Sequence, residues 1–225
     1  MPDLRLLSYN VKSLREDGEA ASAVIRGCDV DVVAVQEAPR FLRWRSKRAA
    51  LARRAHLVVA TANRPGGLML LTSLRAKVLD RAFTLLPKTP KLHQRAVCAA
   101  LLELDGARWA VASVHLSLSD DERWQHVGPL LDAVRRWDAP LVVAGDINEQ
   151  PQDRVWQMLA SQFQDAYAVA PDGPAETYHS RRPHKRIDAI FVDEHVTVVG
   201  SHAVHDVAGV TRGSDHLPVL AVLRQ

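Results

Sequence analysis

The chain has 225 residues, which suits one domain or two small ones. Hydrophobic residues make up 47% of the sequence and charged residues 24%, which supplies a full core and is ordinary for a soluble protein. The formal net charge is only +3, so it permits an anionic partner without requiring one, and no apolar run is long enough to span a membrane.

The two cysteines, Cys28 and Cys98, lie in apolar contexts, and neither belongs to a pair with metal-type or redox spacing. Buried, inert thiols are therefore predicted, and an oxidising compartment is not indicated. The first strand-like segment begins at Leu4, which leaves no room for a signal peptide. We expect a cytoplasmic, monomeric protein that needs no membrane.

The first part of the chain predicts strands with two interspersed helices. An apolar strand over residues 4–9 ends in Asn10, and a short helix follows over residues 20–26. A second strand over residues 30–36 ends in Glu37. Pro39 suits the first turn of a helix, which is expected to continue to about residue 55. Short strands are predicted over residues 56–61, 68–72 and 77–85.

The second part of the chain opens with a hairpin signal. Residues 95–104 and 108–114 flank Asp105-Gly106, a dipeptide typical of two-residue hairpin turns, and the second strand ends in His115. Ser119 with Glu122 three residues later predicts a capping box, for a helix to about residue 137. Because no linker or repeat interrupts the chain, we expect one mixed α/β domain. The remaining predictions are a strand from residue 141, a helix over 153–160, a loop-rich region over 163–185, and strands over 187–192, 196–204 and 217–223.

The stretch Leu141-Val-Val-Ala-Gly-Asp-Ile-Asn148 ends a buried strand with an acid and an amide. Residues two apart on a strand point the same way, so Asp146 and Asn148 are expected to project together. A carboxylate beside an amide can accept a proton from water and hold a polar substrate. The alternative is a polar strand end that caps the next helix.

The same pattern recurs at other predicted strands, and each instance has an ordinary explanation. Asn10 could form a turn, Glu37 could favour a helix start, and His115 could be a buried histidine. Asp188 lies inside an apolar strand, where an acid must be paired or functional. Together with Asp215-His216, these groups supply oxygen ligands and two imidazoles, which suit Mg²⁺ or Mn²⁺ acting on a phosphate. Zinc is disfavoured because no cysteine or close histidine pair is available.

Six short motifs follow one another along the chain: Ser8-Tyr-Asn10, Val35-Gln-Glu37, Ser113-Val-His115-Leu116, Gly145-Asp-Ile-Asn148, Arg186-Ile-Asp-Ala-Ile-Phe191 and Ser214-Asp-His216. In this order they resemble the motifs of the endonuclease/exonuclease/phosphatase superfamily, which includes pancreatic deoxyribonuclease, abasic-site endonucleases, sphingomyelinases and inositol polyphosphate phosphatases. The resemblance implies an α/β fold: a four-layer α-β-β-α sandwich, with two mixed sheets packed face to face and helices outside, in a single domain over residues 1–225.

The resemblance also implies roles for these residues. Glu37 would be the main Mg²⁺ ligand, with Asn10 and Asp215 nearby. Asp146 would activate or orient the attacking water, and Asn148 would hold that water or a phosphate oxygen. In the same scheme His216, oriented by Asp188, would contact the scissile phosphate. His115 would bind or protonate the substrate on the other side of that phosphate.

Two departures from abasic-site endonucleases matter. Lys12 stands where those enzymes carry an acid, which weakens the case for a second metal site. Lys12 could instead hold a phosphate or be a solvated lysine. His115 stands where they carry a tyrosine, as in deoxyribonuclease-like and sphingomyelinase-like members.

Cationic residues cluster around the predicted site. Residues 40–54 contain seven cations and no acid, and on a helix Arg40, Arg43, Lys47 and Arg54 would fall within about 60° of one another. Phe41, Trp44, Leu51 and Ala55 would form the neighbouring apolar face. Further clusters occur at residues 181–186 and 88–95. The alternative is that arginine is simply frequent in this chain. The candidate phosphate-binding residues are Lys12, Arg40, Arg43, Arg95 and Arg186.

The leading functional hypothesis is a Mg²⁺- or Mn²⁺-dependent phosphodiesterase acting on nucleic acid, with DNA ahead of RNA. The alternative is an enzyme for a small-molecule, inositol-phosphate or lipid-derived phosphate ester. The short chain and the lack of an obvious DNA-gripping insertion favour that alternative, although no apolar surface loop indicates lipid insertion. A third hypothesis is a binding protein without catalysis.

Overall fold

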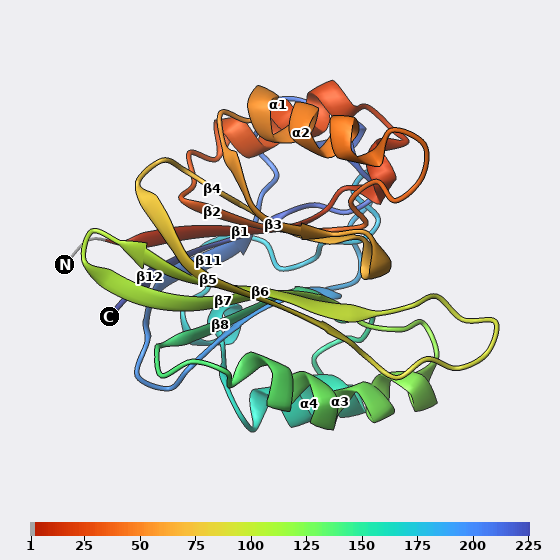
Figure 1. Ribbon diagram of the computed structural model, residues 1–225, viewed down its shortest axis with the longest axis vertical. Coiled ribbons are helices and arrows are strands. Elements are labelled where there is room, and N and C mark those ends of the chain that lie inside the picture. The colour runs from red at the N-terminus through yellow and green to blue at the C-terminus, as the bar shows by residue number, and fades with distance from the viewer. Residues whose placement is uncertain (1–2) are drawn as a thin grey trace.

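The computed structural model describes residues 3–225, which form two six-stranded sheets packed face to face (Figure 1). Helices cover the outer face of each sheet, so the predicted four-layer sandwich is confirmed. In the first sheet the order is β11 (Thr197–Ala203), β12 (Val219–Arg224), β1 (Leu4–Asn10), β2 (Val32–Gln36), β4 (Leu68–Thr72) and β3 (Val58–Asn63). In the second it is β5 (Ala76–Leu85), β6 (Ala96–Leu104), β7 (Ala107–His115), β8 (Leu141–Asp146), β10 (Asp188–Val192) and β9 (Gln164–Asp165).

Helices form the two outer layers (Figure 1). Helices α1 (Gly18–Gly27) and α2 (Trp44–Arg54) lie over the first sheet, and α3 (Asp120–Val134) and α4 (Arg154–Ala160) lie over the second. No helix in residues 3–225 is both long enough and apolar enough to cross a membrane. Short helical segments are η1 (Lys12–Leu14), η2 (Pro65–Gly67), α5 (Ala166–Val169) and α6 (Val210–Gly213).

Successive side chains of an inner strand point to opposite faces of the sheet, and both faces are buried, so these strands are apolar throughout. In β2, Val32 and Ala34 pack between the two sheets, whereas Val33 and Val35 pack in the cluster formed with α1 and α2. A strand that is buried on both faces needs apolar residues at every position. A third cluster fills the space between the second sheet and α3 and α4. Both cysteines are buried and free, as predicted.

The hairpin prediction is confirmed at β6 and β7. Asp105 and Gly106 form its two-residue turn, with φ of 49° and 86°. Positive φ at both central residues is the requirement of a type I′ turn, and it matches the twist of the flanking strands. The capping-box prediction is wrong, because the Ser119 side chain makes no cap hydrogen bond. Glu122 instead accepts a hydrogen bond of 2.6 Å from the backbone N–H of Thr89, in the loop after β5.

The helix predicted from Pro39 is also corrected. Helix α2 begins at Trp44, and residues 39–43 are an irregular loop that ends with Arg43 in the left-handed region at φ 58°. The carbonyl of Pro39 accepts a hydrogen bond of 2.9 Å from the buried Arg48 side chain, which fixes the loop. The predicted basic stripe of four cations on one helix face therefore does not form.

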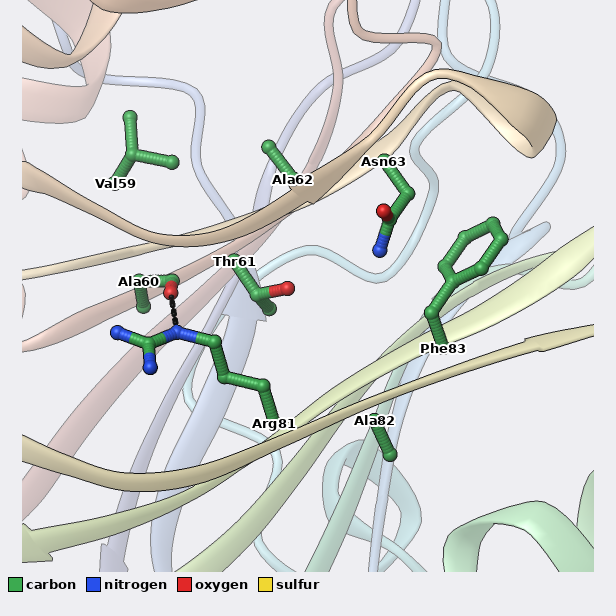
Figure 2. Close-up of a pocket in the computed structure, with 8 residues that line it drawn as sticks. All are labelled: Val59, Ala60, Thr61, Ala62, Asn63, Arg81, Ala82 and Phe83. Atoms are coloured by element: carbon green, nitrogen blue, oxygen red, sulfur yellow. Dashed lines mark hydrogen bonds between the residues drawn. The ribbon is translucent and has the colours of Figure 1, made fainter.

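The edge strands β3 and β5 lie side by side at one flank of the sandwich. Arg81 of β5 donates a hydrogen bond of 2.6 Å to the carbonyl of Ala60 of β3 (Figure 2). A hollow of about 520 Å³ opens there, and within residues 3–225 Arg81 is the one ionisable side chain that lines it.

Candidate active site

Strand direction brings the predicted polar residues to one edge of the sandwich. Strands β1 and β2 are parallel, and so are β7 and β8, whose register places His115 beside Asp146. Strand β10 is antiparallel to β8 and begins with Asp188 opposite Asp146. Strand β12 is antiparallel to β1, so the preceding Asp215 and His216 arrive at the end of β1. Strand ends and strand starts therefore converge, as the sequence pattern required.

A direct hydrogen bond joins the two sheets at this edge. The Nδ2 of Asn10, at the end of β1, donates to the Oδ2 of Asp146, at the end of β8, over 2.9 Å. Both side chains are buried. Gly145 allows β8 to approach its neighbour, because a Cβ at this position would lie 2.0 Å from the carbonyl oxygen of Val114. The glycine of the motif thus sets the position of the carboxylate that follows it.

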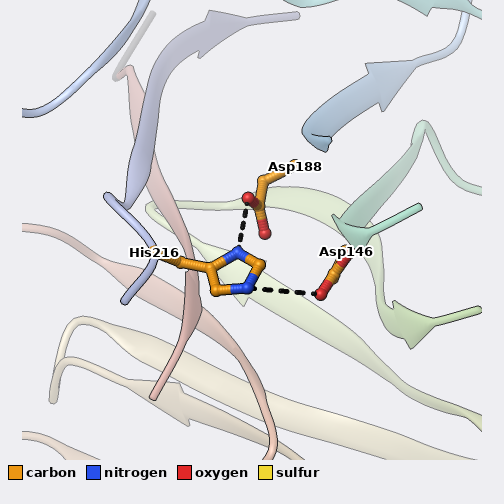
Figure 3. A group of neighbouring side chains, drawn as sticks. All are labelled: Asp146, Asp188 and His216. Atoms are coloured by element: carbon orange, nitrogen blue, oxygen red, sulfur yellow. Dashed lines mark hydrogen bonds and ion pairs between the residues drawn. The ribbon is translucent and has the colours of Figure 1, made fainter. Parts of the chain in front are cut away.

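His216 lies between two carboxylates (Figure 3). Its Nδ1 is 2.9 Å from Asp188 Oδ2, and its Nε2 is 3.8 Å from Asp146 Oδ2. Burial opposes the charged imidazole, but Asp188 and Asp146 outweigh it and raise the pKa of His216 to about 10. His216 is therefore a cation at neutral pH, and its Nδ1–H is donated to Asp188.

The second histidine has the opposite character. His115 Nε2 lies 3.4 Å from Asp146 Oδ2, the same oxygen that His216 Nε2 approaches. Burial, reinforced by the Arg95 guanidinium, holds the pKa of His115 well below its usual range, so this imidazole is neutral. Burial and the Asp188 carboxylate raise the pKa of Asp146 to about 7. The site thus pairs a cationic and a neutral imidazole around one poised carboxylate.

Asn148 fixes the other oxygen of this carboxylate. Its backbone N–H donates to Asp146 Oδ1 over 3.0 Å, and its side-chain amide donates to the carbonyl of Leu116 over 3.0 Å. Asn148 adopts a positive φ of 56°, which is uncommon outside glycine and occurs at functional sites. The turn after β8 is therefore shaped to hold Asp146.

A cavity of about 610 Å³ opens in front of these side chains. Of the predicted catalytic and metal-binding residues, Glu37, His115, Asp146, Asn148, Asp215 and His216 line it, and Asn10 and Asp188 lie directly behind as hydrogen-bond partners. The lining also includes Arg15, His93 and Tyr178, which sequence analysis did not select. Each of these three belongs to an irregular segment, where no periodic pattern marks which side chains face inward.

The candidate phosphate-binding residues fall into two groups. Arg40 and Arg95 line the cavity, and Lys12 lies beside it with Nζ 3.0 Å from Asp215 Oδ2. Arg43 is exposed outside the cavity, where the irregular loop directs it.

Arg186 is also outside the cavity lining. Its guanidinium forms an ion pair with Asp165 and lies 4.8 Å from the Trp156 ring centroid and 4.6 Å from that of Tyr167. Through these contacts the Arg186 side chain holds the segment before β10. The sequence did not indicate this structural role, because Arg186 stands in a run of cations.

The residues at the cavity wall fit a divalent cation. Glu37 is half-buried and adopts φ 49°, and Asn10 Nδ2 lies 3.4 Å from its Oε1. No lysine, arginine or histidine of residues 3–225 forms an ion pair with Glu37, so this carboxylate is free to bind a metal. Carboxylate and amide oxygens suit Mg²⁺ or Mn²⁺.

A second set of possible metal ligands overlaps the site. Ligand atoms of Asp146, Asp188 and His216 lie within 4.8 Å of one another. The Nδ1–H of His216 already bonds Asp188, and its charge balances Asp146, so the ion pairing explains this cluster without a metal.

A family model described as "Endonuclease/Exonuclease/phosphatase family" matches residues 7–216. No curated protein matches the sequence significantly.

Several solved structures share the fold. An endonuclease/exonuclease/phosphatase from Bacteroides vulgatus is similar with a TM-score of 0.83 and 20% identity, over 100% of this chain and 99% of that one. The mannosyl-6-phosphatase Bt3783 of Bacteroides thetaiotaomicron VPI-5482 is similar with a TM-score of 0.82 and 15% identity, over 99% of this chain and 100% of that one. A humanized D. rerio TDP2 is similar with a TM-score of 0.73 and 18% identity, over 99% of each chain. At these identities the likeness shows the fold alone.

Proposed function

The chain belongs to the endonuclease/exonuclease/phosphatase family, and on that premise we propose that it is a metal-dependent phosphodiesterase that hydrolyses nucleic acid. The observation that carries the proposal is the set of four groups around one carboxylate. Asn10, His115, Asn148 and His216 each approach Asp146 within 2.9 to 3.8 Å, next to a cavity with cationic side chains.

Asp146 is the proposed base for the attacking water. Burial and the Asp188 carboxylate raise its pKa, and a carboxylate with a raised pKa accepts a proton from water more readily. Asn10 and Asn148 hold one oxygen each, so the carboxylate keeps one orientation while a proton is transferred. Glu37, with Asn10 and Asp215, would hold Mg²⁺ or Mn²⁺, which when bound neutralises phosphate charge and lowers the pKa of coordinated water.

The two histidines have different proposed tasks. Cationic His216 would bind a non-bridging phosphate oxygen and stabilise the charge that develops there. Asp188 keeps the imidazole in one orientation through the bond to Nδ1. Neutral His115 would donate a hydrogen bond to another phosphate oxygen or to the leaving oxygen. Arg40 and Arg95 would bind the same phosphate from the cavity wall.

Cations outside the cavity support a polyanionic substrate. Arg43, Arg45 and Lys47 are exposed at the start of α2, and Arg181 and Arg182 are exposed in the loop before β10. Phosphates of a nucleic acid are bound by such groups without sequence recognition, with an affinity that falls steeply with salt. DNA is the first substrate to test.

A small phosphate ester is the second candidate, and the cavity itself favours it. Its volume of about 610 Å³ is typical of small-molecule sites, and Arg95 is buried within its wall. A solved structure of the same fold is a mannosyl-6-phosphatase.

A substrate panel with Mg²⁺, Mn²⁺ and chelator tests the proposal. It contains plasmid DNA, RNA, oligonucleotides, sugar phosphates and inositol phosphates, with Asp146→Ala as the blank. Asp132→Ala, an exposed carboxylate on α3, is the matched control. Metal-dependent cleavage of nucleic acid that Asp146→Ala loses and Asp132→Ala keeps is expected. Hydrolysis of sugar or inositol phosphates alone would transfer the assignment to the second candidate, and no hydrolysis at all would refute both.

A further inference from the structure

A second depression adjoins the catalytic cavity. It has a volume of about 330 Å³ and is lined by Arg40, Phe41, Arg64, Pro65 and His93. Arg40, Phe41 and His93 line the catalytic cavity as well, so the two spaces adjoin at these side chains. The catalytic cavity contains carboxylates, whereas no acid of residues 3–225 lines the second depression. A ligand that extends from the catalytic centre past Phe41 would meet the guanidinium groups of Arg40 and Arg64 and the apolar rings of Phe41 and Pro65.

The buried Arg48 fixes the walls of this depression. It is only 2% exposed, and its donors are directed at backbone carbonyl oxygens. Nε donates to Pro39 over 2.9 Å, and Nη1 donates to Asn63 over 2.9 Å. Loop 38–43 and the end of β3 are thus joined through one guanidinium, which makes Arg48 a positioning residue.

Two further contacts hold the same walls together. The N–H of Ala38 donates to the carbonyl of Gly67 over 2.7 Å, and Arg64 Nε donates to the carbonyl of Arg40 over 3.1 Å. Gly67 has φ 66°, and a Cβ there would lie 3.1 Å from Arg40 Cδ, so the glycine also makes room for Arg40. The shape of the depression is therefore fixed by hydrogen bonds between two loops, residues 38–43 and 64–67.

Phe41 is exposed in a way that a structural phenylalanine is not. Its side chain is 66% exposed, and the Arg40 guanidinium carbon lies 5.9 Å from its ring centroid. Exposed aromatic rings beside cations are the usual means of binding single-stranded nucleic acid, because a base stacks on the ring while cations contact the backbone. A base that is paired and stacked in a duplex cannot reach such a ring.

We propose that this depression is a subsite for one unpaired nucleotide next to the scissile phosphate, and that the enzyme prefers single-stranded nucleic acid. Phe41 stacks on the base, and Arg40, Arg64 and His93 contact the adjoining phosphate. The inference rests on the proposed nuclease function, because it names the form of nucleic acid that the same site takes.

The test measures binding and cleavage separately. Fluorescence anisotropy with chelator present compares a labelled oligothymidylate with an oligonucleotide of equal length whose central nucleotides lack bases. Stacking of one base predicts that the base-containing oligonucleotide binds about 5- to 150-fold more tightly. Phe41→Ala should remove this difference, and Phe41→Trp should retain it. The neighbouring Leu42, 82% exposed but absent from the lining of both depressions, provides the control Leu42→Ala, which should bind as wild type does.

Three outcomes are decisive. Equal affinity for the two oligonucleotides in a wild type that cleaves DNA would overturn the subsite and leave the nuclease proposal standing. If the wild type cleaves no nucleic acid but binds the base-containing oligonucleotide more tightly, and Phe41→Ala loses this difference, the subsite would be supported and the nuclease proposal refuted. Equal losses in Phe41→Ala and Leu42→Ala, with unchanged thermal unfolding midpoints, would indicate a general apolar patch for a membrane or protein and overturn the inference.

Discussion

Gly145→Ala tests whether the close approach of β8 to β7 positions the catalytic carboxylate. The added methyl would lie 2.0 Å from the carbonyl oxygen of Val114, about 1 Å closer than carbon and oxygen tolerate. Val114 pairs with Gly145 inside the sheet, so the contact can be relieved only by separating β8 from β7. Displacing a reacting group by about 1 Å costs on the order of 10²-fold in rate. Overpacking also destabilises by about 1–3 kcal/mol, which lowers Tm by roughly 2–12 °C at this size.

The assay pairs turnover on the best substrate of the panel with thermal unfolding, and Gly128→Ala is the matched control. Gly128 lies on the exposed face of α3, and nothing lies within 4 Å of a Cβ there. Replacing a helical glycine gains about 0.5–1 kcal/mol, partly offset because Pro129 follows, so Tm should move by less than about 4 °C with turnover unchanged. Turnover in Gly145→Ala within threefold of wild type would refute the positioning argument.

Three other predictions concern the catalytic groups. Asp146→Ala and His216→Ala should each slow turnover by about 10²-fold or more, and near-normal kcat in both would contradict the role assignments. His216 has a pKa of about 10 in the folded state, raised from the usual 6.5, so its ion pairing stabilises the fold fully below about pH 6.5 and is lost as pH rises through 10. Asp188→Asn removes the nearest carboxylate, so the alkaline limit of kcat should move to lower pH, and an unchanged pH profile would show that Asp188 does not hold the proton. Glu37→Gln should weaken Mn²⁺ binding at least tenfold by calorimetry without added substrate, and unaltered affinity would place the metal elsewhere.

The parts of the site that sequence predicts are those that strands carry. Asn10, His115 and Asp146 each end an apolar run, and the side-chain period of a strand gives their direction before any tertiary contact is known. Asp188 is recognisable because an acid inside such a run needs a partner, and His216 is that partner. The side-chain period of a strand and the cost of burying an acid are both local properties, so the sequence alone is sufficient to predict these residues.

The loops could not be predicted, because distant contacts decide their conformation. Residues 39–43 have the composition of a helix start, yet the carbonyls of Ala38 and Pro39 accept hydrogen bonds from the Arg48 side chain and no helix forms there. Arg48 itself belongs to a run of cations, and sequence does not show that it alone is buried while Lys47 is exposed. Glu122 has the spacing of a capping box but accepts the Thr89 N–H. In each case a tertiary hydrogen bond overrides the local preference.

This division assigns different tasks to strands and loops. The groups proposed for bond cleavage lie at strand ends whose register fixes them across both sheets, as the Asn10–Asp146 hydrogen bond shows. The groups proposed to select the substrate, Phe41 and Arg64 among them, lie on two loops held by Arg48 and by each other. Loop residues can change without disturbing the sheets, because few core contacts depend on them. Substrate choice in this chain is therefore to be sought in residues 38–43 and 64–67, and the chemistry in the strand ends.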